Sequence, residues 1–270
     1  MNHIVRFVCI VLLAWAGATL AEDHLRLATT TSTQDSGLLK VLHPAVETAL
    51  NIKIDVIAVG SGKALKLGEN GDVDVLLVHD PEAEEKFVAA GFGVDRAPVM
   101  HNDFILLGPA ADPAGVRQAG DIVTAMRKIA EAGASFISRG DESGTHQKEL
   151  KLWRAATVTP EGRWYLAVGQ GMGAVMKIAD DKLAYTLADR GTYLALRSKL
   201  DLVIVSAGDT ELYNPYHVIL IDPAKQPHVE YDLAKRYADF LRGAEGQKII
   251  REYRVEGEAL FHPDALPGEE

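Results

Sequence analysis

Residues 24–42 read His-Leu-Arg-Leu-Ala-Thr-Thr-Thr-Ser-Thr-Gln-Asp-Ser-Gly-Leu-Leu-Lys-Val-Leu, and this stretch decides the fold. Apolar and polar side chains alternate from His24 to Ala28, which predicts a strand. Five consecutive hydroxyl residues at 29–33 predict a polar loop, and the leucine-rich run that starts at Gly37 predicts a helix. The stretch is therefore a unit of strand, loop and helix.

The same unit recurs along the first half of the chain. We expect the following elements there: strand 52–59, loop Gly60-Ser61-Gly62, helix 63–69, buried strand 73–78, helix 81–90 with a proline in its first turn, and strand 103–107. Strands that alternate with helices at this spacing indicate parallel sheets covered by helices on both faces. Such sheets bind ligands at the carboxyl ends of their strands, so we look for a site in the loops that follow strands.

The second half repeats the α/β pattern after a stretch rich in Pro, Ala, Asp and Gly at 109–115, which is typical of a link between domains. The expected elements are helix 121–132, strand 135–138, a helix opening near Ser143, a glycine-rich turn at 169–173, strands 184–187, 202–206 and 216–221, and helices 232–241 and 245–253. We therefore expect two α/β lobes. Lobe I comprises residues 22–107 and 211–270, lobe II comprises residues 108–210, and the chain crosses between them near residues 107 and 210.

The first 21 residues have the pattern of a secretory signal peptide. Arg6 supplies a positive charge, an apolar run covers 7–15, and small residues lead to a cleavage site after Ala21. A retained membrane anchor is the alternative, but the apolar run is shorter than the ~20 residues that a spanning helix needs. Cleavage would remove Cys9, the only cysteine. A cysteine-free exported chain indicates the bacterial periplasm.

Charge and cysteine content exclude several classes of protein. The chain has 28 basic and 38 acidic residues and a formal net charge of −10, which disfavours binding to nucleic acid or anionic lipid. One cysteine makes neither an internal disulfide nor a multi-thiolate metal site. The fold must therefore be held by its apolar core.

Two loops of the first half suit an anion. Thr30, Thr31 and Ser32 lie among five hydroxyls between a strand end and a helix start, where backbone N–H groups and the helix dipole favour negative charge. N-capping would need only one of these hydroxyls. Ser61 lies between two glycines at a second helix start, which suits either an anion site or a tight turn. This loop lacks the first glycine of a nucleotide-binding P-loop.

The clearest signal is Ser-Arg-Gly-Asp-Glu-Ser-Gly-Thr-His at residues 138–146. Arg139 can donate a fork of charged hydrogen bonds to one oxyanion, while Ser143 and Thr145 add hydroxyls and N–H groups from a helix start. A salt bridge from Arg139 to Asp141, with Ser143 as a helix cap, is compatible with the same segment. At a similar junction, capping by Asp189 explains its segment without Arg190, so a ligand contact by Arg190 stays open.

Catalytic and metal sites find little support. Ser143 and His146 are three residues apart, but no G-x-S-x-G elbow is present, so a secreted serine hydrolase is a minor alternative. The nine histidines form no H-E-x-x-H pattern, and we expect no catalytic residues, no cofactor and no metal site.

The segments 28–39, 60–65, 138–146 and 185–193 occur in the order found in periplasmic tungstate-binding proteins of ABC-type tungstate importers, which this chain resembles over essentially all of its mature length. The resemblance implies a two-lobed type II periplasmic binding fold, each lobe a sheet flanked by helices, that closes on one tetrahedral oxyanion and delivers it to an ABC permease. It assigns ligand binding to Thr30, Ser61, Arg139 and Thr145, and also to Thr31, Ser32 and Ser143. We expect a monomer.

The choice of anion depends on protons. Monohydrogen phosphate needs an acceptor for its proton, whereas tungstate and molybdate offer none and are repelled by a facing carboxylate. Asp141 therefore favours phosphate if it points into the cleft and the larger oxoanions if it turns back onto Arg139. Tungstate and molybdate are alike in shape and charge, and only the family resemblance favours tungstate over molybdate.

Overall fold

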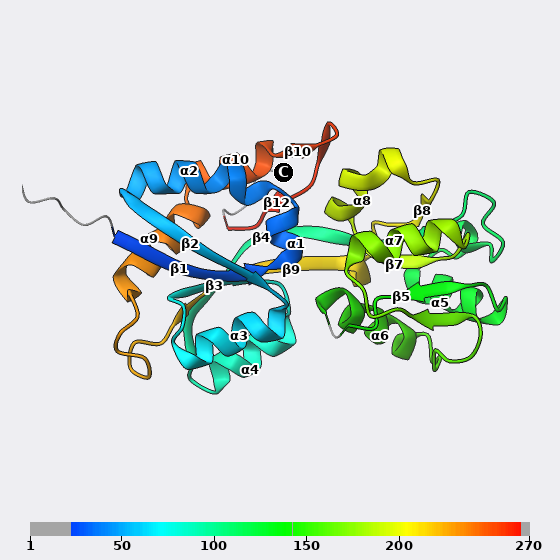
Figure 1. The fold of residues 1–270 in the computed structure, drawn as a ribbon, viewed down its shortest axis with the longest axis horizontal. Helices are drawn as coiled ribbons and strands as arrows, with labels where there is room; N and C mark the ends of the chain where they lie inside the picture. The colour runs from blue at the N-terminus through cyan, green and yellow to red at the C-terminus, as the bar shows by residue number, and fades with distance from the viewer. Residues whose placement is uncertain (1–22, 142, 266–270) are drawn as a thin grey trace, which may run out of the picture.

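The computed structural model describes residues 23–141 and 143–265. The predicted signal peptide, including Arg6, Cys9 and Ala21, lies outside these residues. The chain forms two lobes, one containing the N-terminal elements and the C-terminal helices, the other the middle of the chain (Figure 1). Among the described helices, none is long and apolar enough to cross a membrane.

The strands are β1 (Asp23–Thr30), β2 (Ile52–Val59), β3 (Val75–Val78), β4 (Gly93–Gly108), β5 (Phe136–Ser138), β6 (Tyr165–Ala167), β7 (Thr186–Asp189), β8 (Val203–Ser206), β9 (Tyr213–Ile221), β10 (Arg254–Val255), β11 (Glu258–Ala259) and β12 (His262–Pro263). The helices are α1 (Thr31–Asp35), α2 (Leu38–Leu50), α3 (Ser61–Asn70), α4 (Pro81–Ala89), α5 (Ile122–Glu131), α6 (Gly144–Ala155), α7 (Met172–Asp181), α8 (Arg190–Leu196), α9 (Tyr231–Arg242) and α10 (Ala244–Glu252). Short 3-10 turns lie at Val116–Gln118, Arg197–Lys199 and Thr210–Leu212.

The main sheet of lobe I has the strand order β12-β4-β9-β3-β1-β2. Strands β2 and β3 both pair with β1 in parallel, as the sequence predicts. Strand β9 pairs antiparallel with both β3 and β4, so the sheet is mixed and the expectation of purely parallel sheets is wrong. The reason is that β9 returns from lobe II in the opposite direction to the strands it joins.

Strand β3 shows why both faces of this sheet carry helices. Its four residues are all buried, but Val75 and Leu77 join one apolar cluster while Leu76 and Val78 join another. Successive side chains of a strand point to opposite faces, so a strand buried on both faces must be apolar throughout. A third cluster, which contains Trp153, lies in lobe II, where the first cluster also extends to Val175 and Met176 of α7.

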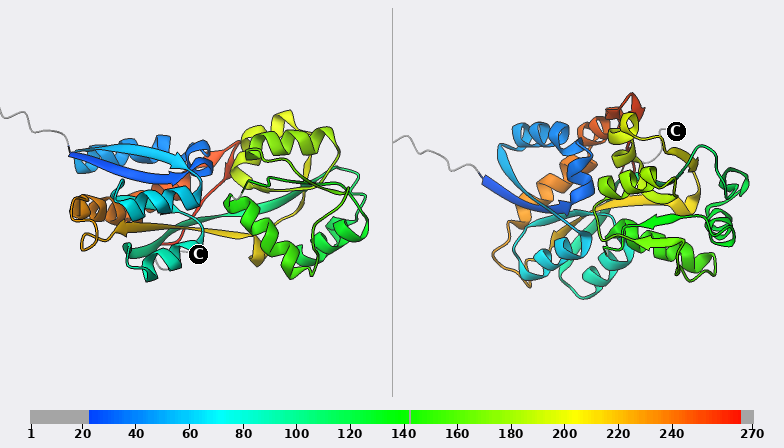
Figure 2. Two further views of the ribbon diagram at one scale, coloured as in Figure 1. Left: turned by 60° about the horizontal axis from the view of Figure 1, so that its bottom comes forward. Right: turned by 45° about the vertical axis from the view of Figure 1, so that its right-hand side comes forward.

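The two lobes are joined by the long strands β4 and β9, which Figures 1 and 2 show running from one lobe into the other. Residues up to Asp103 in β4 pair with β9, whereas Phe104 to Gly108 pair with β7 and β8 of lobe II. The partners of β4 thus change from lobe I to lobe II strands near the predicted crossings at 107 and 210. The exact lobe limits stay a prediction.

The Pro-rich stretch at 109–115 lies after this change of pairing. Its Asp112 accepts a hydrogen bond from the Tyr185 hydroxyl, and the Ala114 amide donates to the same hydroxyl. The first crossing is therefore not in this stretch but within β4, because a continuous strand can carry the chain between lobes without a flexible linker.

Most predicted elements exist within a few residues of the expected ends. The polar loop expected at 29–33 is wrong, because β1 continues to Thr30 and α1 begins at Thr31 with Thr30 as its cap. The sequence also missed the short strands β6, β10, β11 and β12, the helix α7 that follows the glycine-rich turn, and the full length of β4, which begins at Gly93 instead of residue 103. Strand β6 is mostly exposed, so no apolar alternation marks it.

Candidate functional site

A pocket of about 420 Å³ lies between loops of the two lobes. Lobe I contributes Thr31 and the segment from Gly60 to Lys63, and lobe II contributes Arg139, Asp141 and Ser143. Four of the seven predicted ligand residues, Thr31, Ser61, Arg139 and Ser143, thus line one cavity. Segments more than 70 residues apart in the sequence meet here because each follows the end of a strand and begins a helix.

The N-terminus of α3 presents unpaired backbone donors to this pocket. Gly60 is its N-cap residue and makes no side-chain cap, and the first intrahelical bond runs from the Ala64 amide to the Gly60 carbonyl at 2.9 Å. The amides of the first three helical residues therefore have no partner within the helix. A Cβ atom at Gly60 or Gly62 would meet no atom within 4 Å, which indicates open space beside these amides. This is the geometry of an anion site at a helix start.

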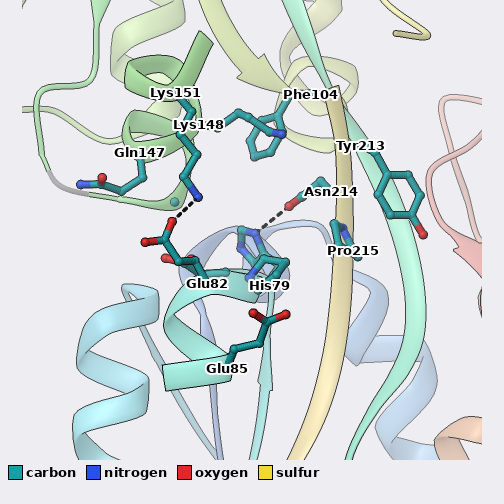
Figure 3. Close-up of a pocket in the computed structure, with 13 residues that line it drawn as sticks. His79, Glu82, Glu85, Phe104, Gln147, Lys148, Lys151, Tyr213, Asn214 and Pro215 are labelled. Atoms are coloured by element: carbon teal, nitrogen blue, oxygen red, sulfur yellow. Dashed lines mark hydrogen bonds and ion pairs between the residues drawn. The ribbon is translucent and has the colours of Figure 1, made fainter. Parts of the chain in front are cut away.

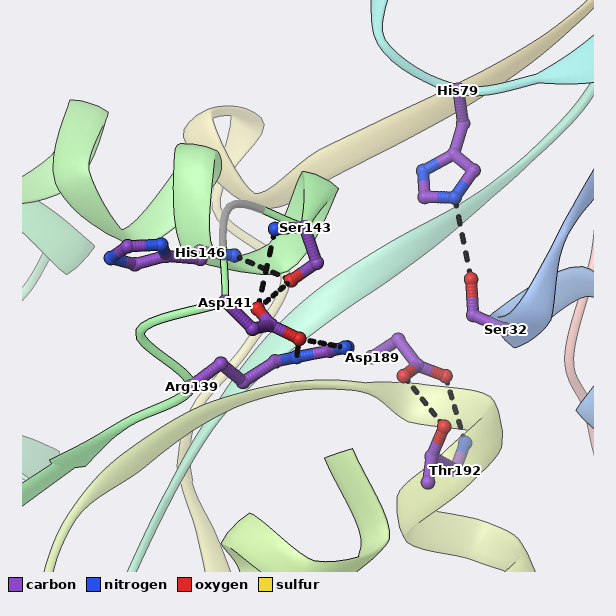
Figure 4. A network of polar contacts seen from close by, with 8 residues as sticks. All are labelled: Ser32, His79, Arg139, Asp141, Ser143, His146, Asp189 and Thr192. Carbon is purple, nitrogen blue, oxygen red and sulfur yellow. Dashed lines mark hydrogen bonds and ion pairs between the residues drawn. The ribbon is translucent and has the colours of Figure 1, made fainter. Parts of the chain in front are cut away.

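The hydroxyl run places its members differently. Thr31 is exposed and lines the pocket. Thr30 caps α1 by accepting a bond from the Thr33 amide at 3.2 Å, and only 3% of Thr30 is exposed. Ser32 is half-buried, and its hydroxyl lies 3.3 Å from Nε2 of His79 (Figure 4). Neither Thr30 nor Ser32 is among the residues that line the pocket, so any ligand contact by them remains a prediction.

On the lobe II side, Arg139, Asp141 and Ser143 form one hydrogen-bonded unit (Figure 4). Arg139 donates from Nε at 3.0 Å and from Nη2 at 2.6 Å to the same Asp141 oxygen, Oδ2. The other oxygen, Oδ1, accepts from the Ser143 hydroxyl at 2.6 Å and from its amide at 3.2 Å. Asp141 therefore turns back onto Arg139, the orientation that favours oxoanions without a proton.

The ionisation of Asp141 follows from these contacts. Burial raises its pKa, but the hydrogen bonds from Arg139 and Ser143 and the guanidinium charge outweigh burial, so the pKa of Asp141 lies below its usual value. Both oxygens of the carboxylate are occupied by donors. Among the described residues that line the pocket, it is the one carboxylate, and it is held as the counter-ion of Arg139.

Helix α6 begins against lobe I. Its N-cap Ser143 accepts a bond from the His146 amide at 3.3 Å, and the next residue is Gly144. A Cβ on Gly144 would lie 3.4 Å from Cε1 of His79 and 3.7 Å from Oγ of Ser61, both in lobe I. Thr145 is buried and is not among the residues that line the pocket. The start of α6 thus closes one side of the site, and glycine permits the close approach.

A neighbouring cavity of about 320 Å³ continues the cleft between α4 and α6 (Figure 3). Lys151 of α6 forms an ion pair with Glu82 of α4, with 3.0 Å between Nζ and Oε2. Hydrogen bonds from Lys86 and Lys151 lower the pKa of Glu82 to about 2, so the carboxylate is charged at neutral pH. This ion pair links the two lobes across the cleft.

Arg190 lies elsewhere. It donates from Nε to Oδ1 and from Nη2 to Oδ2 of Asp103, both at 2.6 Å, and it lines a separate cavity of about 520 Å³. Asp189 caps α8 by accepting from the amide and hydroxyl of Thr192, as expected. No described contact brings Arg190 to the Arg139 pocket.

His79 is the residue that sequence reasoning missed. It follows the buried strand β3 directly, and its ring contacts the hydroxyls of Thr30 and Ser32. The sequence signal that could have found His79 is its position directly after a strand, because ligand residues were expected in the loops that follow strands. Lys63, which begins the predicted helix 63–69, also lines the pocket and adds a positive charge, although no role was predicted for it.

The contacts of Ser143 do not suit a nucleophile. Its hydroxyl donates to Asp141, and in Figure 4 the His146 ring points away from it. A nucleophile and its base must lie within hydrogen-bond reach. In the described part of the chain, no group of three or more His, Cys, Asp or Glu residues is arranged to hold a metal ion.

The chain is similar to known oxyanion-binding proteins along most of its length. The model of the PBP superfamily domain matches residues 17–245. The tungstate-binding protein TupA of Peptoclostridium acidaminophilum is 49% identical over 251 residues, covering 92% of this chain and 88% of that protein. A putative ABC transporter anion-binding protein of Haloferax volcanii is also 49% identical over 251 residues, covering 91% of this chain and 73% of that protein.

Solved structures give the same result. The tungstate ABC transporter protein of Geobacter sulfurreducens is 56% identical, with a TM-score of 0.78, and the match covers 85% of this chain and 98% of that one. TupA of Desulfovibrio alaskensis G20 is 44% identical, with a TM-score of 0.81 and coverage of 90% and 100%. These matches confirm the predicted two-lobed type II binding fold. The chain belongs to the PBP superfamily and, within it, to the family of TupA tungstate-binding proteins, which are solute-binding proteins of ABC transporters and not enzymes.

Proposed function

We propose that this protein captures tungstate, as the tetrahedral oxyanion, in the pocket between its two lobes and delivers it to an ABC permease. One observation carries the proposal: the open amides at the start of α3 face the same cavity as Arg139 and Ser143 of the other lobe. Donors from two lobes around one small cavity suit an ion that closure sequesters.

Each side of the pocket would hold the ion differently. The amides of Ser61 and Gly62 and the hydroxyls of Thr31 and Ser61 are neutral donors, whereas Arg139 supplies a charged one. Ser143 already donates its hydroxyl to Asp141, so its part is to hold that carboxylate in place. Thr30, Ser32 and Thr145 complete the proposed set, with Thr30 acting through its cap on α1.

The net charge of −10 does not prevent anion binding. Salt screens distant surface carboxylates beyond ~10 Å, while fixed donors in a closed cleft act at short range and low dielectric. A hydrogen bond to a charged group contributes ~1.5–3 kcal/mol, so a handful of preorganised donors can offset the ordering cost and reach nanomolar affinity, ~−12 kcal/mol.

The state of Asp141 supports an unprotonated oxoanion over phosphate. Its oxygens accept from Arg139 and Ser143, which leaves no well-placed acceptor for the proton of monohydrogen phosphate. Tungstate is proposed over molybdate because relatives of this chain are named tungstate-binding proteins.

The proposal includes the setting of the protein. Signal-peptide cleavage after Ala21 would release a monomer into the periplasm. Lobe I would comprise residues 22–107 and 211–270, and lobe II residues 108–210. Bending of β4 and β9 would open and close the cleft, and the Glu82–Lys151 ion pair supports the closed arrangement.

Calorimetric titration of the ligand-free mature protein with tungstate, molybdate, sulfate and phosphate tests this function. We expect submicromolar binding of tungstate, and we expect equimolar phosphate to leave the tungstate titration unchanged. Effective competition by phosphate would make the protein a phosphate binder, and no heat with any of the four anions would refute an oxyanion site.

A further inference from the structure

We propose that His79 is a positioning residue of the oxyanion site, which ties the start of α1 to the two strands that cross between the lobes and so holds the hydroxyl loop in place beside the pocket. The expected effect of His79 on tungstate affinity rests on the proposed function.

His79 is the first residue after β3, and only 8% of it is exposed. Its ring stacks on Tyr216 of β9, with centroids 4.6 Å apart and planes 29° apart. Gly144 of lobe II lies against the ring, since a Cβ atom on Gly144 would lie 3.4 Å from Cε1 of His79. The imidazole therefore lies between lobe I, a crossing strand and the start of α6.

The contacts of Asn214 fix which ring nitrogen carries the proton. Asn214 donates from Nδ2 to Oδ1 of Asn102 at 2.6 Å and to the Tyr216 hydroxyl at 3.3 Å, so its Oδ1 is the atom that faces His79. That oxygen is 3.0 Å from Nδ1 of His79. Because an amide oxygen only accepts, Nδ1 carries the hydrogen and Nε2 is an acceptor.

Nε2 thus accepts a hydrogen bond from one of two nearby hydroxyls, Thr30 at 3.2 Å or Ser32 at 3.3 Å. The Thr30 oxygen also accepts from the Thr33 amide at 3.2 Å and lies 2.6 Å from the Thr33 hydroxyl. The Thr30 hydroxyl also lies 3.1 Å from the Ser32 hydroxyl, so Thr30, Ser32 and Thr33 form one cluster of hydroxyls next to Nε2. By accepting a hydrogen bond from this cluster, His79 holds the hydroxyls at the start of α1 in place beside Thr31, which lines the pocket.

The neutral state of the ring fits this role. Burial lowers the pKa of His79, while the hydrogen bond to Asn214 and the carboxylates of Glu84, Asp189 and Asp80 act in the opposite direction. The ring is therefore neutral at neutral pH, and Nε2 remains an acceptor. The chain of bonds from Asn102 through Asn214 and His79 to Thr30 joins both crossing strands to α1.

Two variants separate positioning from packing. His79→Phe keeps a flat ring on Tyr216 and removes both nitrogens, whereas His79→Gln loses the ring and can keep an acceptor near the position of Nε2. Positioning predicts that tungstate affinity falls by roughly tenfold or more in the Phe variant and by less in the Gln variant, because an unpaired buried hydroxyl is costly. Packing alone predicts the reverse order. Calorimetry gives the affinities, and thermal unfolding of the ligand-free variants checks the fold.

A second measurement needs no ligand. Positioning predicts that hydrogen exchange of the Thr33 amide, followed by NMR in the ligand-free protein, becomes faster in His79→Phe and stays near the wild-type rate in His79→Gln. Equal rates in all three proteins, or a Phe variant that binds tungstate as well as wild type, would overturn the inference. If wild type fails to bind tungstate, the proposed function fails, and the Thr33 exchange still decides the role of His79.

Discussion

Arg139 and Arg190 occupy equivalent places in lobe II, and their surroundings differ. Each follows a short strand and lies near the start of a helix, α6 or α8. The partner of Arg139 is Asp141, two residues away in the same loop, and both line the pocket shared with lobe I. The partner of Arg190 is Asp103, which lies in the distant strand β4. The position of the partner decides which cavity the guanidinium lines.

The bonding pattern explains this difference. Arg139 uses Nε and Nη2 on a single oxygen of Asp141, and among the described residues no bond from Nη1 is found. Arg190 uses Nε and Nη2 on both oxygens of Asp103, a bidentate pair that satisfies the carboxylate and fixes the side chain. A loop-internal pair presents a guanidinium to the cleft, and a pair between elements holds the fold together.

The sharpest test of the comparison is Arg139→Ala. We expect tungstate affinity to fall at least ~100-fold, or about 3 kcal/mol, because a charged donor is lost and Asp141 is left to repel the ion. Calorimetry measures the change. Removing Asp141 as well should recover part of the loss, so the Arg139→Ala/Asp141→Ala protein should bind more tightly than Arg139→Ala. An affinity equal to wild type in the single variant would show that Arg139 is not in the site.

The second test concerns Glu149, buried in the helix that follows the Arg139 loop. Burial raises its pKa to about 7, against hydrogen bonds from Tyr165 and Trp153. The folded state then holds a proton that the unfolded state has released, so stability is full below pH ~4.5 and falls as pH rises to ~7, by up to about 3 kcal/mol.

Replacing Glu149 with Gln should remove this slope. Denaturant unfolding of wild type and Glu149→Gln at pH 5, 6, 7 and 8 measures it, and the two proteins should differ most at pH 8. Parallel curves for the two proteins would mean that Glu149 is ionised in the folded state. The Asp103→Asn protein, altered outside this helix, serves as the control with an unchanged slope.

The smallest effect on binding is expected from Arg190→Ala. Tungstate affinity should stay within about threefold of wild type, while stability falls by about 1 kcal/mol because a partly exposed ion pair is lost. Asp103→Asn is the matched control and should lower stability to a similar extent. A large loss of affinity in Arg190→Ala, with none in Asp103→Asn, would place Arg190 in contact with the ligand and end the distinction between the two arginines.

Much of the candidate site could be predicted from single loops. Thr31, Ser61, Arg139 and Ser143 share a signal that is local, a hydroxyl or guanidinium between a strand and a helix start, and the structure gathers all four around one pocket. Arg190 carries the same signal and pairs with β4 instead. No local pattern separates the two arginines, because the partner of Arg190 is 87 residues away.

His79 and the strand pairing show the opposite limit. His79 follows an apolar strand with no other mark, and its importance comes from Asn214, Thr30 and Ser32, which reach it from other parts of the chain. The antiparallel entry of β9 into the sheet of lobe I likewise leaves no trace in hydrophobic alternation, since side chains alternate in the same way in parallel and antiparallel strands.

The sequence by itself determined the α/β units, the family, and the hydroxyl and guanidinium donors, because these depend on the period of apolar residues and on neighbours within a few positions. Only the tertiary structure decided that Asp141 turns onto Arg139, that Arg190 pairs with Asp103, and that His79 contacts the hydroxyl loop. In each case the side chain could bond to more than one partner, and the partner it bonds is the one that the fold brings within reach. The distances between residues far apart in the chain cannot be read from the order of residues.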